Sequence, residues 1–163
     1  YLRDGSKGNN LYEKIMEAGK EFGLQPGHTS SIRRIEGGML SYHADADINT
    51  NPFELGLDRL VNLDSDIEFL GKEKLKQIKS QGISKKIMGV KIDLNQINVS
   101  KAIDITINSK RVGELRSGVY SPTFNQVIGI AMIDKPFFEV DTKIEIMINN
   151  ETKTGVLCNI PFV

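Results

Sequence analysis

The spacing of the apolar residues changes near residue 85, and this change limits the folds that are open to the chain. Before that point apolar side chains recur at helical intervals, as in Leu11, Ile15, Ala18 and Phe22. After it they alternate with polar side chains, as in Ile103–Ile107. A helix repeats every 3.6 residues and a strand every two. The sequence therefore predicts an α+β chain with one region over residues 1–82 and another over residues 83–163.

Two helices are expected early in the first region. Residues 10–22 are predicted to form one, because Asn10 and Glu13 have the spacing of a capping box. Gly23 suits the left-handed position that follows a helix. A second, shorter helix is predicted over residues 29–36, where Ser and Thr side chains are available as caps and a glycine pair follows.

The rest of the chain divides into short elements. We expect a helix start at residues 51–54, a short strand at residues 60–63 and a Lys-rich helix at residues 71–80. Six strands are then predicted at residues 87–92, 103–107, 112–117, 127–133, 143–148 and 152–158. Short strands separated by turn residues are typical of a small antiparallel barrel or sandwich.

Acidic and basic residues balance, which limits the partners that composition suggests. The 21 Lys and Arg residues equal the 21 Asp and Glu residues, so no overall field attracts nucleic acid or an anionic membrane. No apolar run is long enough to cross a bilayer. The single cysteine, Cys158, cannot form an intrachain disulfide, and the polar start has no signal peptide. These features predict a cytoplasmic protein with no nucleic-acid or membrane partner.

The chain begins at Tyr1 rather than at a Met, and Tyr1–Arg3 is typical of the end of a strand. We expect the protein to continue upstream of Tyr1, and Tyr1–Arg3 to pair with a strand outside this chain, because an unpaired strand exposes backbone donors and acceptors. The two histidines, His28 and His43, form no metal-binding pattern with Cys158 or the acidic residues. No metal ligand is predicted.

Charged and conformationally free residues gather between residues 33 and 47. Arg34 and Glu36 are two positions apart on a predicted helix, so they lie on different sides of it and cannot pair with each other. Each needs a partner elsewhere in the protein or in a ligand. Tyr42 offers a ring for stacking, and Asp45 adds an acceptor. The alternative is a surface helix with solvated charges that ends at a glycine pair.

The order of several motifs resembles one enzyme family. Arg34–Gly38, followed by Tyr42 and Asp45–Asp47, resembles the aminomethyltransferase pattern Arg-x-Glu-(Ala/Gly)-Gly and then Tyr-Gly-x-Asp-x-Asp. Further matches keep the family's order at Asn51–Leu57, Phe69–Lys72, Val112–Glu114, Ser117–Pro122, Ile128–Ala131 and Ile160–Val163. The resemblance implies the end of a folate-binding aminomethyltransferase-fold region over residues 1–82, followed by a small antiparallel β-barrel domain over residues 83–163.

Three departures from the family pattern favour one branch. His43 stands where the family usually has Gly, Arg59 where an aromatic residue is common, and Thr50 precedes Asn51 where a second Thr is usual. These departures resemble the dimethylsulfoniopropionate demethylases more than the glycine-cleavage T-protein. The implied activity moves a methyl group from dimethylsulfoniopropionate to N5 of tetrahydrofolate, the methyl acceptor, giving 5-methyltetrahydrofolate and methylmercaptopropionate.

Two alternatives remain open beside this activity. One is aminomethyl transfer in the glycine cleavage system, which needs a lipoyl carrier protein. The other is a non-catalytic folate-binding module of the same fold, although its Lys-Gly-Cys-Tyr-x-Gly-Gln-Glu motif is absent.

The resemblance also implies which residues act. It assigns Arg34, Tyr42 and Glu36 to the folate pocket, and it places the catalytic groups upstream of Tyr1, so this part of the chain alone is predicted to be inactive. The implied partners are a small sulfonium substrate, folate and the N-terminal part of the same enzyme, and a homodimer is compatible with the pattern.

Overall fold

The computed structural model describes residues 2–27 and 30–163. Residues 1–30 and 31–163 form two compact units. In the first unit a 3-10 turn, η1 (Gly5–Lys7), precedes helix α1 (Gly8–Gly19) and a second 3-10 turn, η2 (Lys20–Phe22). Gly23 then ends the helix with a φ of 68°, as predicted. The helix expected over residues 10–22 is confirmed, with an earlier start and a tightened final turn.

The beginning of the chain differs from two expectations, while the pairing of residues 1–3 with a strand outside this chain stays a prediction. Leu2 and Arg3 do not lie in a strand, and Tyr1 is outside the described residues. The Asp4 side chain instead accepts a 3.0 Å hydrogen bond from the backbone N of Ser6, which caps a helical turn immediately after Arg3. Asn10 consequently lies inside α1 rather than at its N-cap.

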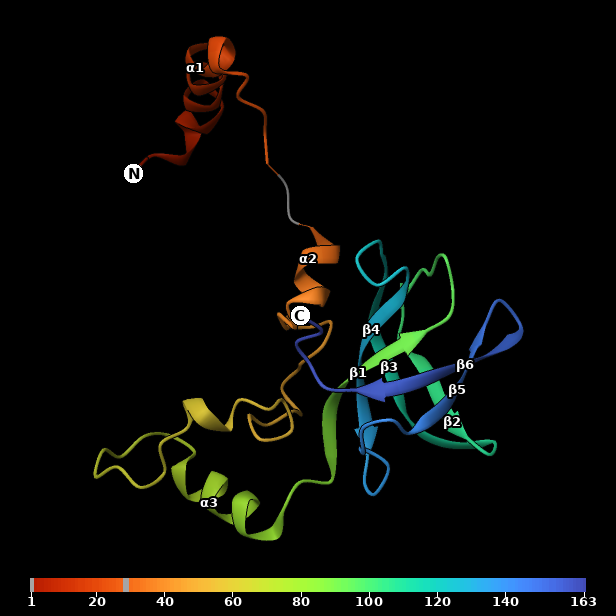
Figure 1. The fold of residues 1–163 in the computed structure, drawn as a ribbon. Coiled ribbons are helices and arrows are strands. Elements are labelled where there is room, and N and C mark those ends of the chain that lie inside the picture. Colours follow the sequence, from red (N-terminus) through yellow and green to blue (C-terminus); the bar gives the residue numbers. More distant parts are fainter. Residues whose placement is uncertain (1, 28–29) are drawn as a thin grey trace. The chain divides into compact units, whose positions relative to one another are not determined.

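Six antiparallel strands close into a barrel in the second unit (Figure 1). They are β1 (Lys85–Ile92), β2 (Ile103–Ile107), β3 (Lys110–Ser121), β4 (Gln126–Asp134), β5 (Lys143–Ile148) and β6 (Glu151–Cys158). The order around the barrel is β1-β4-β3-β2-β5-β6, and β1 also pairs with β6. Closure pairs each strand on both sides, so the sheet has no open edge. The predicted fold class, with its small antiparallel barrel, is confirmed.

The barrel interior is filled by aliphatic side chains. Alternate positions of β4, including Val127, Ala131 and Ile133, point into it. The other buried members of this core are Met88, Val90, Ile92, Ile105, Val112, Leu115, Ile144, Ile146 and Leu157. Each of these side chains is at most 1% exposed, so the barrel interior is a packed core.

A second apolar cluster covers the outer face of β4. Ile128, Ile130 and Met132 alternate with the inward residues and pack against Ile35 of helix α2 (Ser31–Glu36) and Ile87 of β1. Ile35 is only 1% exposed. Because both faces of β4 are buried, its sequence reads as a continuous apolar run. The cluster fixes α2 against the barrel.

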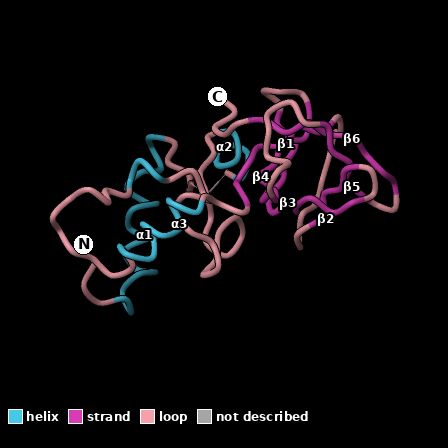
Figure 2. Tube along the Cα trace, turned by 90° about the horizontal axis from the view of Figure 1, so that it is seen from below, coloured by secondary structure: helices cyan, strands magenta, loops and turns pink. Residues whose placement is uncertain are grey.

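The C-terminus lies beside α2 in both views of the chain (Figures 1 and 2). The backbone N of Phe162 donates a 2.9 Å hydrogen bond to the carbonyl oxygen of Glu36. Gly38, with a φ of 62°, approaches Pro161 so closely that a Cβ would lie 3.1 Å from the Pro161 Cα. A larger residue at position 38 would push this contact apart. The expected helix over residues 29–36 is confirmed from Ser31 onward, and Thr29 and His28 lie outside the described residues.

The strand expected at residues 60–63 is wrong. A 3-10 turn, η3 (Asp58–Leu60), occupies its beginning, and the chain then bends toward helix α3 (Lys72–Gln81). The side chain of Lys72 is 4% exposed, and its Nζ donates to the carbonyl oxygens of Ser65 at 2.5 Å and Ile67 at 3.1 Å. Within the expected strand, the backbone N atoms of Leu60 and Val61 donate to the carbonyl oxygens of Leu57 and Asp58, so these hydrogen bonds close a turn instead of joining a strand. The Lys-rich helix itself is confirmed.

The helix start expected at residues 51–54 has the predicted caps but no helix. The Asn51 Oδ1 accepts hydrogen bonds from the backbone N atoms of Phe53 and Glu54, and the Glu54 carboxylate accepts one from the Asn51 N. The turn ends at Gly56, whose φ is 67°. One capped turn therefore forms and stops, because glycine allows the backbone to reverse there.

The connection between these loops and the barrel is direct. The backbone N of Ile87 donates a 2.7 Å hydrogen bond to the carbonyl oxygen of Glu54. Residues 31–163 form one compact unit, and the domain boundary expected between residues 82 and 83 stays a prediction. Over the described residues, no helix has the length and apolar content needed to cross a membrane.

Candidate functional site

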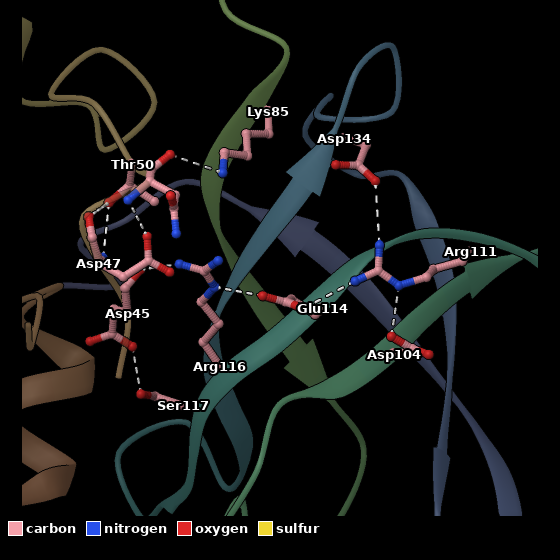
Figure 3. A network of polar contacts seen from close by, with 11 residues as sticks. Asp45, Asp47, Thr50, Lys85, Asp104, Arg111, Glu114, Arg116, Ser117 and Asp134 are labelled. Carbon is pink, nitrogen blue, oxygen red and sulfur yellow. Dashed lines mark hydrogen bonds and ion pairs between the residues drawn. The ribbon is translucent and has the colours of Figure 1, made fainter. Parts of the chain in front are cut away.

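Residues 34–47 carry the first family motif and are called the motif segment. Asp45 is the centre of the polar contacts in this segment. Its side chain is fully buried. Oδ2 accepts hydrogen bonds from Nη1 of Arg34 at 2.5 Å and from the backbone N of Ser41 at 2.8 Å. Oδ1 accepts one from Oγ of Ser117 at 2.5 Å (Figure 3). A buried carboxylate is stable only when it is paired and hydrogen-bonded, and Asp45 meets both conditions.

Arg34 is anchored through one of its three nitrogens. Nη1 donates to Asp45 and, at 3.0 Å, to the carbonyl oxygen of Met39. Within the described residues, no hydrogen bond joins Nη2 or Nε to another group, and 24% of the side chain is exposed. A guanidinium carries five N–H donors in a fixed plane. Arg34 is therefore held in place through only part of its fork.

Glu36 faces the barrel. Its Oε1 accepts a 2.5 Å hydrogen bond from Oγ of Ser121, a buried residue at the end of β3. As predicted from their spacing, Arg34 and Glu36 do not pair with each other, and each finds its own partner in the protein. The contacts of Glu36 tie α2 to the barrel.

Tyr42 borders a pocket of about 520 Å³ between the 42–47 loop and the barrel. Tyr42 is 60% exposed, and its ring lies 4.4 Å, centroid to centroid, from the ring of His43. The other residues that line the pocket are Ala44, Asp47, Val99, Ser100, Lys101, Ala102, Glu114 and Arg116. The three residues that the motif predicts thus separate: Tyr42 lines this pocket, Arg34 pairs with Asp45, and Glu36 pairs with Ser121.

A chain of hydrogen bonds and ion pairs runs from the backbone of Asp45 across the barrel surface (Figure 3). Arg116 donates from Nη1 to the Asp45 carbonyl oxygen at 2.8 Å and from Nε to Glu114 at 2.9 Å. Glu114 also accepts from Arg111, which donates from Nε to Asp104 at 2.7 Å. This bond to Asp104 is the main cause that raises the pKa of the Arg111 guanidinium. The network attaches the motif segment to β3.

Sequence reasoning did not identify Arg116 and Ser117 as part of the site. They lie 71 and 72 positions after Asp45, so no local pattern relates them to it. One signal was present: Glu114 and Arg116 are two apart in a predicted strand and therefore lie on the same face. That spacing indicates a surface ion pair but does not name Asp45 as its neighbour.

Cys158 and the potential metal ligands offer less chemistry than Arg34 and Asp45. Burial raises the pKa of the Cys158 thiol, which disfavours its reactive thiolate form. Among the residues that the structure describes, no three His, Cys, Asp or Glu side chains gather as a metal site would require.

Comparison with known proteins agrees with this arrangement. Residues 1–65 match the family model described as the GCVT N-terminal domain. Residues 85–163 match the one described as the glycine cleavage T-protein C-terminal barrel domain. The barrel found in the structure coincides with the second match, and the Arg34–Asp45 contact lies within the first.

Several curated relatives are named aminomethyltransferase. The protein from Bacillus mycoides is 34% identical over 93% of this chain and 42% of its own length. The protein from Prochlorococcus marinus is 33% identical over 99% of this chain and 42% of its own length. This chain thus spans less than half the length of these relatives.

A solved structure has the same fold. The glycine cleavage system aminomethyltransferase T from Bartonella henselae aligns with a TM-score of 0.73 and 20% identity, over 80% of this chain and 37% of that one. The two family models, the relatives and the fold agree. The chain belongs to the glycine cleavage T-protein family, and residues 85–163 form that family's C-terminal barrel domain.

Proposed function

We propose that this chain carries the C-terminal part of a tetrahydrofolate-dependent aminomethyltransferase. In the proposed reaction the carbon–sulfur bond between an aminomethyl group and a lipoyl carrier protein breaks and restores the lipoyl thiol. The carbon becomes a methylene bridge on tetrahydrofolate, and its amino group is released as ammonia. The support is the agreement of the family models with relatives that are named aminomethyltransferase. Because the chain spans about 42% of those relatives, the rest of the active site is proposed to lie in the length that it does not span.

The observation that carries the proposal is that the Arg34 guanidinium uses only Nη1 for its contacts within the described residues. Folate presents carboxylates and a flat ring with polar edges, and a planar fork of N–H donors suits both. Asp45 holds Nη1, so Nη2 and Nε remain to bind the ligand. Tyr42, whose ring is exposed, is proposed to stack on a flat part of folate. Both residues fit the demands of this substrate.

The role of Glu36 in folate binding stays a prediction. Its Oε1 is engaged by Ser121, and its carbonyl oxygen by Phe162. We propose that Glu36 supports the site by holding α2 on the barrel, while Arg34 and Tyr42 contact the ligand.

Dimethylsulfoniopropionate demethylation, which the three departures from the family pattern favoured, has weaker support. The relatives carry the name aminomethyltransferase, so the alternative expected from the motifs becomes the main proposal. Neither the sulfonium substrate nor the homodimer gains support from the relatives. The test below separates the two donors.

The test compares donors with the same full-length protein and tetrahydrofolate. One reaction contains the aminomethylated lipoyl carrier protein and is followed by ammonia release. The other contains dimethylsulfoniopropionate and is followed by 5-methyltetrahydrofolate formation. We expect tetrahydrofolate-dependent ammonia release and no methyl transfer. The reverse result would identify a demethylase, and folate binding without either product would identify a binding module.

A further inference from the structure

Strand β3 reaches the motif segment through two hydrogen bonds of the same chemical kind. In each, a serine hydroxyl donates to a carboxylate at 2.5 Å: Ser117 to Asp45, and Ser121 to Glu36. Ser117 and Asp45 are buried, as is Ser121. The two carboxylates differ in their other partners. Asp45 pairs with Arg34, whereas the described contacts of Glu36 lead only to the barrel and the C-terminus.

The Asp45 carboxylate joins Ser117 and Arg34 through opposite oxygens. Oδ1 accepts from Ser117, and Oδ2 accepts from Arg34 and from the backbone of Ser41. The terminal torsion of an aspartate is broad and roughly twofold, so the side chain itself does not fix the direction of its oxygens. The hydroxyl of Ser117 supplies the constraint on the Oδ1 side. Removing it leaves a buried acceptor without that donor, which favours rotation of the carboxylate.

We propose that Ser117 is a positioning residue for the site: through Asp45 it sets the direction in which Arg34 presents its remaining donors to folate. This inference rests on the proposed function. Ser117 lies beside a register shift between Leu115 and Ser117 in the pairing of β3 with β4. A β-bulge re-aims the side chains of its strand, and here it accompanies a serine that turns to the motif segment rather than to the sheet. The barrel thereby takes part in shaping the folate pocket.

The experiment measures tetrahydrofolate binding to the full-length protein by isothermal titration calorimetry. The variants are Ser117→Ala, the matched control Ser121→Ala, Arg34→Ala and the double variants of Arg34 with each serine. Melting temperatures of the same samples report any loss of folding. The control removes the same kind of bond from the same strand and the same motif segment, but not the one that leads to Arg34.

We expect Ser117→Ala to raise the dissociation constant about fivefold or more, within the range of coupling found inside one hydrogen-bond network. Ser121→Ala is expected to change it less than about twofold, because the apolar cluster around Ile35 still holds α2 against the barrel. Adding Ser117→Ala to Arg34→Ala is expected to cause no further loss, because both changes act through the same donors. Adding Ser121→Ala should leave the Arg34→Ala value equally unaffected.

The outcomes separate the inference from the function on which it rests. Equal losses for the two serine variants would mean a general loosening of α2 on the barrel and would overturn the positioning role. A Ser117→Ala loss that persists in full beside Arg34→Ala would overturn it as well. A wild-type protein that does not bind tetrahydrofolate would reject the proposed function itself, and with it the inference.

Discussion

Arg34 makes a structural contact through Nη1 and keeps N–H donors that have no hydrogen-bond partner among the described residues. One nitrogen is consumed by Asp45 and Met39, and the others remain outside the described contacts. Sequence reasoning found Arg34, and it correctly inferred that the partner was not Glu36, because two helical positions face different sides. It could not choose Asp45 over Asp47, or find Ser117, because a distant strand brings these groups together.

The first prediction concerns Arg34 itself. Replacing it with Ala in the full-length protein should weaken tetrahydrofolate binding by about 1.5–3 kcal/mol, the size of a hydrogen bond to a charged group. Lys at this position should recover only part of the loss, because an ammonium lacks the planar fork. The neighbouring, exposed Arg33 provides the control, since Arg33→Ala removes the same charge one position away. Calorimetric titration would contradict the assignment if both alanine variants bound equally well.

His43 borders the same pocket as Tyr42, and its backbone conformation provides a test of strain there. Its φ is 75°, in the left-handed region where a side chain costs about 1 kcal/mol and glycine costs little. His43→Gly should therefore raise the free energy of unfolding by roughly that amount, apart from the ring contact with Tyr42 that it removes. Urea denaturation of the two proteins measures the difference. A less stable glycine variant would show that the ring contact outweighs the strain.

At the scale of elements, the site depends on the docking of α2 against the barrel. Period-two spacing predicted the strands because each alternates between two surroundings. It underestimated β3, which runs from Lys110 to Ser121, because Gly118 interrupts the pattern. The strand expected at residues 60–63 failed because the backbone N atoms of Leu60 and Val61 donate to Leu57 and Asp58 in the turn η3. Pairing partners and loop contacts depend on the assembled fold, which spacing does not contain.

Ile35 should be the main apolar anchor of α2. Ile35→Ala empties a fully packed position between α2 and β4, so we expect a loss of about 2–5 kcal/mol in unfolding free energy. The control is Ile67→Ala, because Ile67 is 74% exposed and should lose less than about 0.5 kcal/mol. Chemical denaturation of both variants decides between them. Similar small losses would mean that α2 is not held by this cluster.

Lys72 should stabilise the loop before α3 more than a surface lysine can. Its ammonium holds two backbone carbonyls, so Lys72→Ala should lower the unfolding free energy by about 1–3 kcal/mol. Lys76, on the same helix, pairs with Glu73 at the surface, and Lys76→Ala should leave stability nearly unchanged. Thermal melts of the two variants provide the comparison, and an equal response would rule out a special role for Lys72.

At the scale of the whole molecule, two apolar cores stabilise different parts of residues 31–163. The inner core maintains the barrel, and the outer one fixes α2 so that Arg34, Asp45 and Ser117 meet. The motifs were sufficient to predict the family and the barrel, because they recur in order along the chain. They favoured the demethylase branch on three single-residue departures, whereas the relatives support aminomethyl transfer. The substrate is selected by a complete pocket, and this chain spans less than half of those relatives.

The most direct test of the account is a crystal structure of the full-length protein with tetrahydrofolate bound. We predict that Nη2 or Nε of Arg34 lies within hydrogen-bond distance of the ligand while Nη1 keeps its contact with Asp45, and that Ser117 still donates to Asp45. A ligand bound away from Arg34, or an Arg34 that leaves Asp45 to reach it, would contradict the central claim that the barrel-held Arg34 forms part of the folate site.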